Sequence, residues 1–294
     1  MRDPALESIA ATLEASGDYR VLRRLAPRPP VAAPGDLKLV TGLFVDVETT
    51  GLDPARDEII ELAMVPFTFS ADGRIFEVGA AFNELREPSI PISAEITAIT
   101  GITAEMVAGR SIDPHAVAEF AAPAALVVAH NAAFDRRFLE RYCDAFVAKH
   151  WACSMTQVPW TEEGHEGVKL AYLAQSFGFF YDKHRAVHDC MAALEILARP
   201  LPSTGAPALS RLLERARRPI WRISAENSPF EKKDTLKARG YRWNGDGAPK
   251  AWYIDIDEDR RDAELEFLKA EIYRRDVTLP VRRIDGRDRF SDRC

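Results

Sequence analysis

The protein has 294 residues, of which 47% are hydrophobic and 29% charged, a composition typical of globular proteins that bury a sizeable core. Its 39 Lys and Arg and 45 Asp and Glu give a formal net charge of −6, which argues against a phosphate-rich partner. Because no long apolar run is present, we expect neither a membrane span nor a signal peptide, and the four scattered cysteines are typical of reduced thiols in a cytoplasmic protein.

The negative charge is confined to one part of the chain. Residues 37–200 carry 13 basic and 23 acidic side chains, whereas residues 201–218 have a net charge of +3 and residues 219–294 of +1. Residues 1–36 are neutral overall. The net charge of the whole chain therefore does not exclude a nucleic-acid partner. The excess of acidic residues at 37–200 needs a separate explanation.

The first 36 residues are expected to form a helix followed by a Pro-rich linker. Leu6, Ile9 and Leu13 recur at helical spacing, and Gly17 is placed to end the helix. The run at 26–35 contains four prolines and one glycine, so we expect it to be extended.

Residues 37–200 are expected to form one α/β domain. Apolar and alternating runs predict strands, and 3.6-residue periodicity predicts helices. The expected strands cover 39–47, 58–69, 74–84 and 125–130, and the expected helices cover 134–142, 168–178 and 187–198. A meander of strands followed by strand–helix alternation predicts a mixed sheet with helices packed against it.

A second linker is expected at 201–218, followed by a small α+β domain at 219–294. The latter is predicted to contain a strand at 221–227, a helix at 229–240, a hairpin across 244–250 and a final helix at 257–275. The Arg-rich end of the linker, 215–218, is interpreted as a solvated face.

The most informative residues are Asp46 and Glu48, at the end of the first expected strand. Residues i and i+2 of a strand point to the same face, and two carboxylates held together there need a cation to neutralise them. Oxygen ligands of this kind suit Mg²⁺ or Mn²⁺. Two solvated acids at a strand end are an equally good interpretation of this pair alone.

Two further acids follow in compatible positions. Asp135 falls in the first turn of the helix after the strand at 125–130, where the helix dipole favours an anion, although it could simply cap that helix. His130 and Asn131 lie at the end of that strand, where binding groups gather in α/β sheets. Asp189 lies in the helix at 187–198, five residues after His184.

The three segments DVETTG, HNAAFD and HRAVHD resemble the three exonuclease motifs of the DEDD superfamily, in its histidine-bearing DEDDh branch. The resemblance covers residues 38–200 and is greatest to the proofreading subunit of bacterial replicative DNA polymerase and its stand-alone relatives. It implies an RNase H-like α/β fold and a metal-dependent 3′→5′ exonuclease that releases nucleoside 5′-monophosphates from DNA or RNA ends.

The resemblance also implies roles for particular residues. Asp46, Glu48, Asp135 and Asp189 match the acids that hold two Mg²⁺ or Mn²⁺ ions, and His184 matches the histidine that accepts the proton of the attacking water. All five are therefore expected to be catalytic.

His188 is adjacent to Asp189, but neighbouring residues of a helix diverge by about 100°, so we interpret it as structural or solvent-facing.

The substrate contacts implied by the resemblance are less well defined. Thr49 matches a contact to the terminal 3′-OH, His130 and Asn131 match contacts to sugar or phosphate, and Leu52 and Phe134 match residues that pack on terminal bases. For Leu52 and Phe134, packing in the protein core is an equally good interpretation.

Two further patterns were weighed. A zinc site at Cys143, His150, Cys153 and His165 is disfavoured, because the spacing lacks the close pairs of a zinc knuckle. Cations and aromatic residues alternate in the last domain, which suits nucleic-acid binding, but core packing of a hairpin is the favoured interpretation. The residues concerned are Arg239, Tyr241, Arg242, Trp243, Lys250 and Trp252.

The leading hypothesis is a 3′→5′ exonuclease acting on DNA, preferably on single-stranded 3′ ends. The alternatives are an exoribonuclease that trims RNA and a catalytically silent module that binds nucleic acid or a polymerase. The partners expected are DNA or RNA 3′ ends and a DNA polymerase or repair protein, with a free-standing repair or trimming role favoured and no membrane involved.

Overall fold

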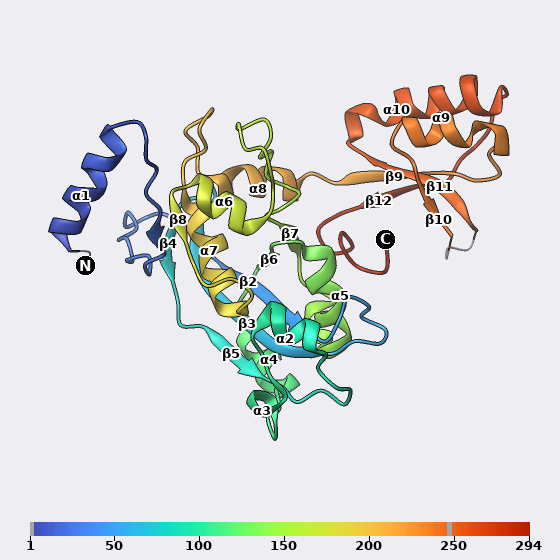
Figure 1. Ribbon diagram of the computed structural model, residues 1–294. Helices are drawn as coiled ribbons and strands as arrows, with labels where there is room; N and C mark the ends of the chain where they lie inside the picture. Colours follow the sequence, from blue (N-terminus) through green and yellow to red (C-terminus); the bar gives the residue numbers. More distant parts are fainter. Residues whose placement is uncertain (1–2, 246–248) are drawn as a thin grey trace. The chain divides into compact units, whose positions relative to one another are not determined.

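The computed structural model describes residues 3–245 and 249–294 (Figure 1). The chain divides into two compact units, which we call the N-terminal unit (Met1–Arg215 with Phe290–Asp292) and the C-terminal unit (Ala216–Arg289 with Arg293–Cys294). The domain boundaries expected at 36, 200 and 218 stay predictions. No helix in the described residues is both long enough and apolar enough to cross a bilayer.

The N-terminal unit is built on a six-stranded mixed sheet. Its strands run in the order β4-β3-β2-β6-β7, with β5 also paired to β3. Strand β2 (Leu39–Thr49) is antiparallel to β3 (Ile59–Ser70) and parallel to β6 (Leu126–Ala129), which is parallel to β7 (Trp151–Cys153). The mixed sheet predicted from the sequence is confirmed.

The prediction of a single strand at 74–84 is wrong, because this stretch forms two short strands. β4 (Ile75–Val78) and β5 (Phe82–Leu85) both pair with β3, at different places along it. Between them the N–H of Gly79 donates to the carbonyl of Pro66 at 2.8 Å, and Pro66 has no N–H to return the bond. The antiparallel ladder is therefore interrupted at Pro66.

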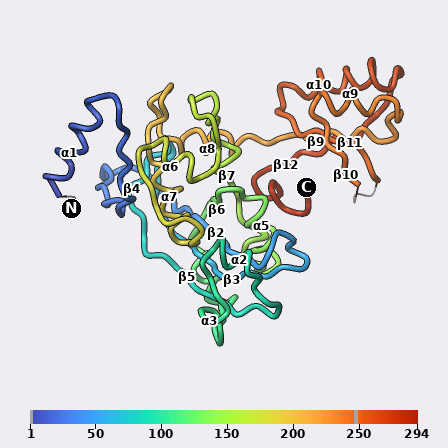
Figure 2. Tube along the Cα trace, in the orientation of Figure 1, coloured from blue at the N-terminus to red at the C-terminus, as the bar shows by residue number. Residues whose placement is uncertain are grey.

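Alternation along β2 separates an apolar face from a functional one. Leu43, Val45 and Val47 are buried in the main core, together with residues of β3, β6, α5 and β7. Asp46 and Glu48 occupy the other face, where Asp189 of α7 (Ala186–Ala198) lies within 4.8 Å of both. The helix α7 packs across β2 and β3 (Figure 2). Burial of the odd-numbered residues thus directs both carboxylates to the α7 side.

Several helices and short strands complete the N-terminal unit. The expected helices appear as α5 (Ala132–Tyr142), α6 (Leu170–Ser176) and α7. The sequence did not predict a further set, namely β1 (Arg23–Arg24), α2 (Ala94–Thr100), α3 (Ala104–Val107), α4 (Pro114–Ala121), η1 (Asp144–Phe146) and β8 (Phe179–Phe180).

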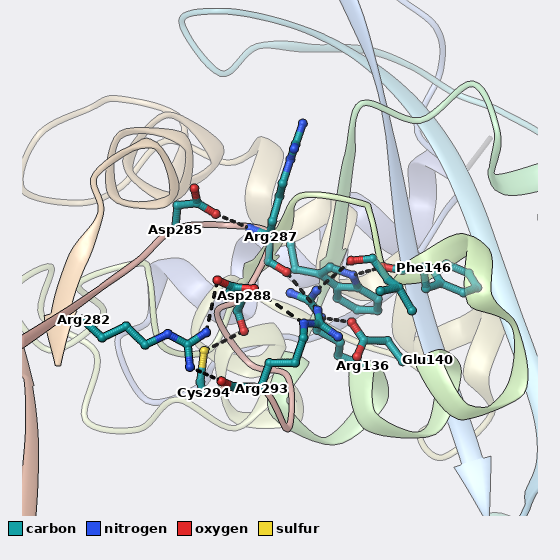
Figure 3. Close-up of polar contacts among 11 residues, drawn as sticks. Arg136, Glu140, Phe146, Arg282, Asp285, Arg287, Asp288, Arg293 and Cys294 are labelled. Atoms are coloured by element: carbon teal, nitrogen blue, oxygen red, sulfur yellow. Dashed lines mark hydrogen bonds and ion pairs between the residues drawn. The ribbon is translucent and has the colours of Figure 1, made fainter.

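The rotation of α5 is set by a buried arginine. Arg136 is fully buried over the ring of Trp151 and pairs with Glu140 one turn later, with 2.7 Å between Nε and Oε1 (Figure 3). A buried guanidinium needs such a partner, so this pair holds one face of α5 inward. Because Asp135 directly precedes Arg136 on α5, the orientation of the helix also determines the position of Asp135.

The first helix, α1 (Pro4–Ala15), forms where expected but does not bury its apolar stripe. Leu6 is 64% exposed and Ile9 57% exposed. Ala10 of α1 is buried, and Arg23 pairs with Glu7 and Glu14 at 2.8 and 3.1 Å. The helix is therefore attached through Ala10 and through these ion pairs, while Leu6 and Ile9 face solvent.

Residues 208–217, expected in a linker, form helix α8 (Ala208–Arg217) instead. Leu209, Leu212 and Leu213 recur at helical spacing and are buried. Burial of this apolar face overrides the flexible composition of the preceding Pro- and Gly-containing stretch. The expected linker at 201–218 thus contains a helix, and its role as a linker stays a prediction.

The C-terminal unit is a four-stranded antiparallel sheet in the order β10-β11-β9-β12. It comprises β9 (Ile220–Ala225), η2 (Phe230–Lys232), α9 (Lys233–Ala238), β10 (Arg242–Asn244), β11 (Ala251–Ile256), α10 (Glu258–Phe267), η3 (Leu268–Tyr273) and β12 (Val281–Ile284). Residues of β9, β11, α9 and η3 share one core, which confirms the predicted small α+β unit.

Two details of the C-terminal unit were not foreseen. Strand β12 was not predicted, although it pairs with β9, and the middle of the expected hairpin loop, 246–248, lies outside the described residues. After β12, Asp288 accepts from Arg282 at 3.3 Å and pairs with Arg293 at 3.5 Å (Figure 3). These contacts attach the C-terminal tail to the edge strand.

Candidate active site

Three carboxylates from two elements converge on the α7 side of the sheet. Asp46 and Glu48 come from the end of β2, and Asp189 comes from the first turn of α7. One carboxylate oxygen of each lies within 4.8 Å of the others. Oxygen atoms at such separations can share one divalent cation, so the residues present fit Mg²⁺ or Mn²⁺.

Asp135 approaches the same place from the first turn of α5. Its side chain is only 2% exposed, and its Oδ1 accepts from the N–H of Val47 at 3.2 Å. Val47 lies between Asp46 and Glu48, so this bond places the fourth carboxylate beside the strand that carries the first two. The structure thus brings together all four acids predicted from the sequence.

The four carboxylates destabilise one another's charged forms. Burial, and then the negative charges of Asp135 and Asp189, raise the pKa of Asp46 well above its ordinary value. Burial and neighbouring acids raise the pKa of Glu48 to about 8, and burial raises the pKa of Asp135 to about 8. Burial also raises the pKa of Asp189. A bound cation would relieve this repulsion, and carboxylate oxygens are suitable ligands for a divalent cation.

A fifth acid, Glu61, was missed by the sequence interpretation. It lies opposite Glu48 in the β2–β3 register and is fully buried. Its carboxylate accepts from Arg185 Nη2 and from the N–H of Ala186, both at 3.1 Å. Glu61 therefore anchors the start of α7, and the signal for it was a lone charge inside the apolar run IIELAMV.

Two donors hold Asp189 in place. Tyr181 Oη donates to Asp189 Oδ1 at 2.7 Å, and the N–H of Arg185 donates to Oδ2 at 3.3 Å. Burial raises the pKa of the Tyr181 hydroxyl, so it stays protonated and acts as a donor. No motif pointed to Tyr181.

The two histidines before α7 have different surroundings. His184 is exposed on the loop, with φ at 59°, and its charge acts on Asp189. His188 is held by a 3.2 Å hydrogen bond between Nδ1 and the carbonyl of Asp182, and it lines a separate pocket with residues 24–28. The structure thus leaves His184 beside the carboxylates and directs His188 elsewhere.

The residues expected to contact substrate differ in how available they are. Leu52 is 83% exposed, so it does not pack in the core, whereas Phe134 stacks on Phe138 with 4.9 Å between ring centroids. Thr49 is buried, and its hydroxyl donates to the carbonyl of Gly51 at 2.5 Å. Asn131 is exposed in the left-handed region at the start of α5.

His130 is engaged on both sides of its ring. Nδ1 lies 2.9 Å from Ser154 Oγ and Nε2 lies 2.9 Å from the carbonyl of Val168. Burial lowers the pKa of His130 to about 4, so the ring is neutral and Nε2 donates to Val168. A contact to sugar or phosphate would have to replace one of these hydrogen bonds.

All four cysteines are free thiols, three of them buried and Cys294 partly exposed. Within the described ranges, the cluster with metal-binding geometry is the carboxylate group of Asp46, Glu48 and Asp189. The cysteines and histidines weighed for zinc do not form such a cluster there.

Comparison with known proteins identifies the class of this site. Residues 43–197, just over half of the chain, match the model of the exonuclease family RNase_T. The protein therefore belongs to this family, and its N-terminal unit contains a nuclease domain with the RNase H-like fold expected from the sequence.

Two curated relatives show the range of the similarity. The chain is 33% identical over 188 residues to the DNA polymerase III subunit epsilon-like protein of Rhodobacter capsulatus, covering 59% of this chain and 25% of that protein. It is 38% identical over 113 residues to the PolC-type DNA polymerase III of Thermotoga petrophila, covering 38% of this chain and 8% of that protein. The chain thus spans a quarter or less of the length of these relatives.

Among solved structures, Escherichia coli exonuclease I in complex with a dA16 oligonucleotide shares the fold. The TM-score is 0.51 at 17% identity, covering 76% of this chain and 67% of that chain.

Proposed function

We propose that the protein is a metal-dependent 3′→5′ exonuclease that removes nucleoside 5′-monophosphates from DNA, preferably from single-stranded 3′ ends. The observation that carries this proposal is the convergence of Asp46, Glu48 and Asp189 within 4.8 Å, next to a buried Asp135. Four acids with mutually raised pKa values in a nuclease family are best explained as ligands of divalent cations.

Each residue then has a defined task. Asp46, Glu48, Asp135 and Asp189 would hold two Mg²⁺ or Mn²⁺ ions, which supply charge neutralisation at the scissile phosphate and its leaving oxygen. His184, exposed beside Asp189, accepts the proton of the attacking water.

Substrate contacts would come from the same edge of the sheet. Leu52 follows the two β2 acids and exposes most of its side chain, so it can pack on an unpaired terminal base. Asn131 is exposed at the start of α5, and Phe134 is partly exposed next to Asp135. Thr49 and His130 would need to exchange an intramolecular hydrogen bond for one to the nucleotide.

DNA is favoured as the substrate because the curated relatives are DNA polymerase III proteins. A polymerase or repair protein would be the corresponding partner. RNA trimming is the alternative, since the same carboxylates would serve either backbone. A silent binding module is disfavoured by the complete set of four acids and His184.

The test uses DNA and RNA oligonucleotides labelled at the 3′ or the 5′ end, incubated with Mg²⁺, Mn²⁺ or chelator. We expect mononucleotides to be released from the 3′ end of DNA only when metal is present. Asp46→Ala should lower the rate by more than about 100-fold while leaving the fold intact, because it removes a ligand from the centre of the cluster.

Asp182→Ala is the matched control. Asp182 lies near α7 but pairs with Arg24 at the surface, so this variant should keep full activity. Undiminished activity of Asp46→Ala, or release from the 5′ end, would show that the proposal is wrong. Release from RNA alone would favour the alternative substrate.

A further inference from the structure

The C-terminal unit, which lies outside the region matched to the exonuclease family, has an aromatic groove of its own. Ala225, Trp252 and Trp243 are paired in register across β9, β11 and β10, so their side chains lie in one row on one face of the sheet. Together with Phe230 of η2, the two tryptophans border a hollow of about 550 Å³. This volume lies within the usual range for ligand sites.

The rings around the groove are unusually exposed for their size. Phe230 is 79% exposed and Trp243 is 53% exposed, whereas Tyr241 and Ile254 from the same part of the chain are buried in the core. Trp243 and Trp252 meet edge to face with 5.7 Å between centroids. The expectation that the hairpin aromatics all pack in the core therefore holds for Tyr241 but not for Trp243.

The charges at the groove are positive and available. Lys233 and Lys250 line it, and no carboxylate is among its described lining residues. Lys233 Nζ lies 4.4 Å from the centroid of Phe230. Among the residues that the structure describes, neither lysine forms an ion pair, whereas Arg222, Arg239 and Arg242 of the same unit are paired with Asp255 or Glu264.

We propose that this groove, bordered by Phe230, Trp243, Trp252, Lys233 and Lys250, binds a segment of single-stranded DNA. Exposed aromatic faces stack on unpaired bases, and unpaired lysines beside them neutralise the phosphates that join those bases. The groove combines flat aromatic faces with two lysines and two uncharged polar residues, Asn227 and Ser228, and this combination suits the bases and phosphates of one strand. The single-stranded nature of the ligand rests on the groove itself, and the choice of DNA rests on the proposed function.

Binding is tested on the full-length protein in chelator, so that no metal-dependent hydrolysis occurs. The probe is a fluorescein-labelled single-stranded thymidine oligonucleotide, followed by anisotropy. Phe230→Ala and Trp243→Leu should each weaken binding by about tenfold, because a base stacked on an aromatic ring contributes this much. Both side chains are largely exposed, so both variants should unfold at the wild-type temperature.

The lysines are tested by the salt dependence of the affinity. Each phosphate contact on a single strand contributes about 0.7 to the slope of log K against log salt, so the double variant Lys233→Ala, Lys250→Ala should lower the slope by about 1.4. Lys269→Ala is the matched control. Lys269 belongs to the same unit but pairs with Glu266 and Asp276, and its removal should leave the slope unchanged.

Tryptophan fluorescence locates the contact. Trp151 and Trp160 are buried, so quenching by the oligonucleotide should come from Trp243 and Trp252. It should be reduced in Trp243→Leu and unchanged in Trp221→Phe. Wild-type affinity and salt slope in all groove variants would overturn the proposal. Equal binding of duplex DNA would also overturn it, because stacking needs unpaired bases, and stronger binding of an RNA oligonucleotide would overturn DNA as the occupant.

Two further experiments distinguish DNA binding at the groove from self-association and from the exonuclease activity. Sedimentation at several protein concentrations tests whether the groove is an interface between two copies of the chain. Concentration-dependent association that Trp243→Leu abolishes would show that a second copy covers Trp243, and the proposal would be wrong. Hydrolysis of a nucleoside 5′-phosphate aryl ester by the wild-type protein tests the proposed function independently. If the groove binds the oligonucleotide but the ester is not hydrolysed, the exonuclease proposal is wrong and the DNA-binding proposal stands. If the ester is hydrolysed but the groove variants bind as the wild type does, the DNA-binding proposal is wrong and the exonuclease proposal stands.

Discussion

Glu61 of β3 and Arg185 of the loop before α7 form an ion pair whose acidic partner is fully buried, with 3.1 Å between Oε1 and Nη2. The same carboxylate accepts from the N–H of Ala186, the first residue of α7. His184 directly precedes Arg185, and Asp189 follows Ala186 within the first turn of α7. The placement of the proposed base and of one proposed metal ligand therefore depends on an acid outside the metal cluster.

Glu61→Gln should lower both stability and activity. The substitution keeps the shape of the side chain but weakens hydrogen bonds to a charged group, so we expect a loss of about 1–3 kcal/mol in urea unfolding. Displacement of α7 should also raise the metal concentration required for activity by about 10–100-fold. Glu58→Gln, which alters the more exposed pair with Arg86, is the control and should change stability less. Equal effects of the two variants would contradict the anchoring role.

His184→Ala should lower kcat by about 10²–10⁴-fold, because a positioned general base contributes this much. Binding of Mg²⁺, measured by calorimetry, should be retained, since the four carboxylates remain. His188→Ala is the matched control, because its ring bonds to the carbonyl of Asp182 and lines a separate pocket. A larger loss of kcat in His188→Ala would show that the wrong histidine was chosen.

The metal-free protein should lose stability as pH rises from about 4 to about 8. Burial and mutual repulsion raise the pKa of Glu48 and of Asp135 to about 8 in the folded state, whereas unfolded acids titrate near ~4. The folded protein therefore binds more protons than the unfolded chain across this range, and the free energy of unfolding falls with pH.

Thermal unfolding in chelator, measured at several pH values, checks this slope. Asp46→Asn removes one repelling charge, so its slope should be shallower and its melting temperature at pH 8 higher than that of the wild type. Added Mg²⁺ should stabilise the wild type more at pH 8 than at pH 6, because bound protons compete with the cation. A flat pH profile in chelator would contradict the clustering of the four acids.

Tyr181→Phe should weaken metal binding without abolishing catalysis. The variant loses the 2.7 Å hydrogen bond to Asp189 Oδ1, so Asp189 is held less firmly, and we expect Mg²⁺ affinity to fall by about 10–100-fold. Tyr172→Phe on α6 removes a hydroxyl that accepts from the N–H of Glu166, and this variant should bind Mg²⁺ as the wild type does. Calorimetric titration distinguishes the two variants.

The expected site combines local periodicity with the resemblance of three motifs, which assigned the four acids as metal ligands. That assignment stays a prediction. Asp46 and Glu48 share a face of β2 by strand alternation, and Asp135 and Asp189 fall in first turns of helices whose patterns were clear. Glu61 was not predicted, because its role depends on the register of β3 against β2 and on Arg185, which is 124 residues away in the sequence. Pairing between distant segments leaves no local pattern to read.

The errors in the fold have the same origin. Pro66 divides the partner of β3 into β4 and β5, an effect that appears only once the two strands are paired. Trp243 follows the alternation of a core strand but lies on edge strand β10, next to the groove.

The distribution of the thiols has a practical consequence. Cys143, Cys153 and Cys190 are buried, and Cys294 is partly exposed, with its Sγ bonded to the carbonyl of Asp288. Because the other three thiols are buried, a maleimide dye should couple selectively to Cys294. Burial raises the pKa of this thiol, so coupling should need a mildly alkaline pH to form the reactive thiolate. The natural sequence thus offers a single attachment point on the C-terminal unit. With a donor dye on the oligonucleotide, energy transfer to Cys294 would follow a DNA strand as it is shortened.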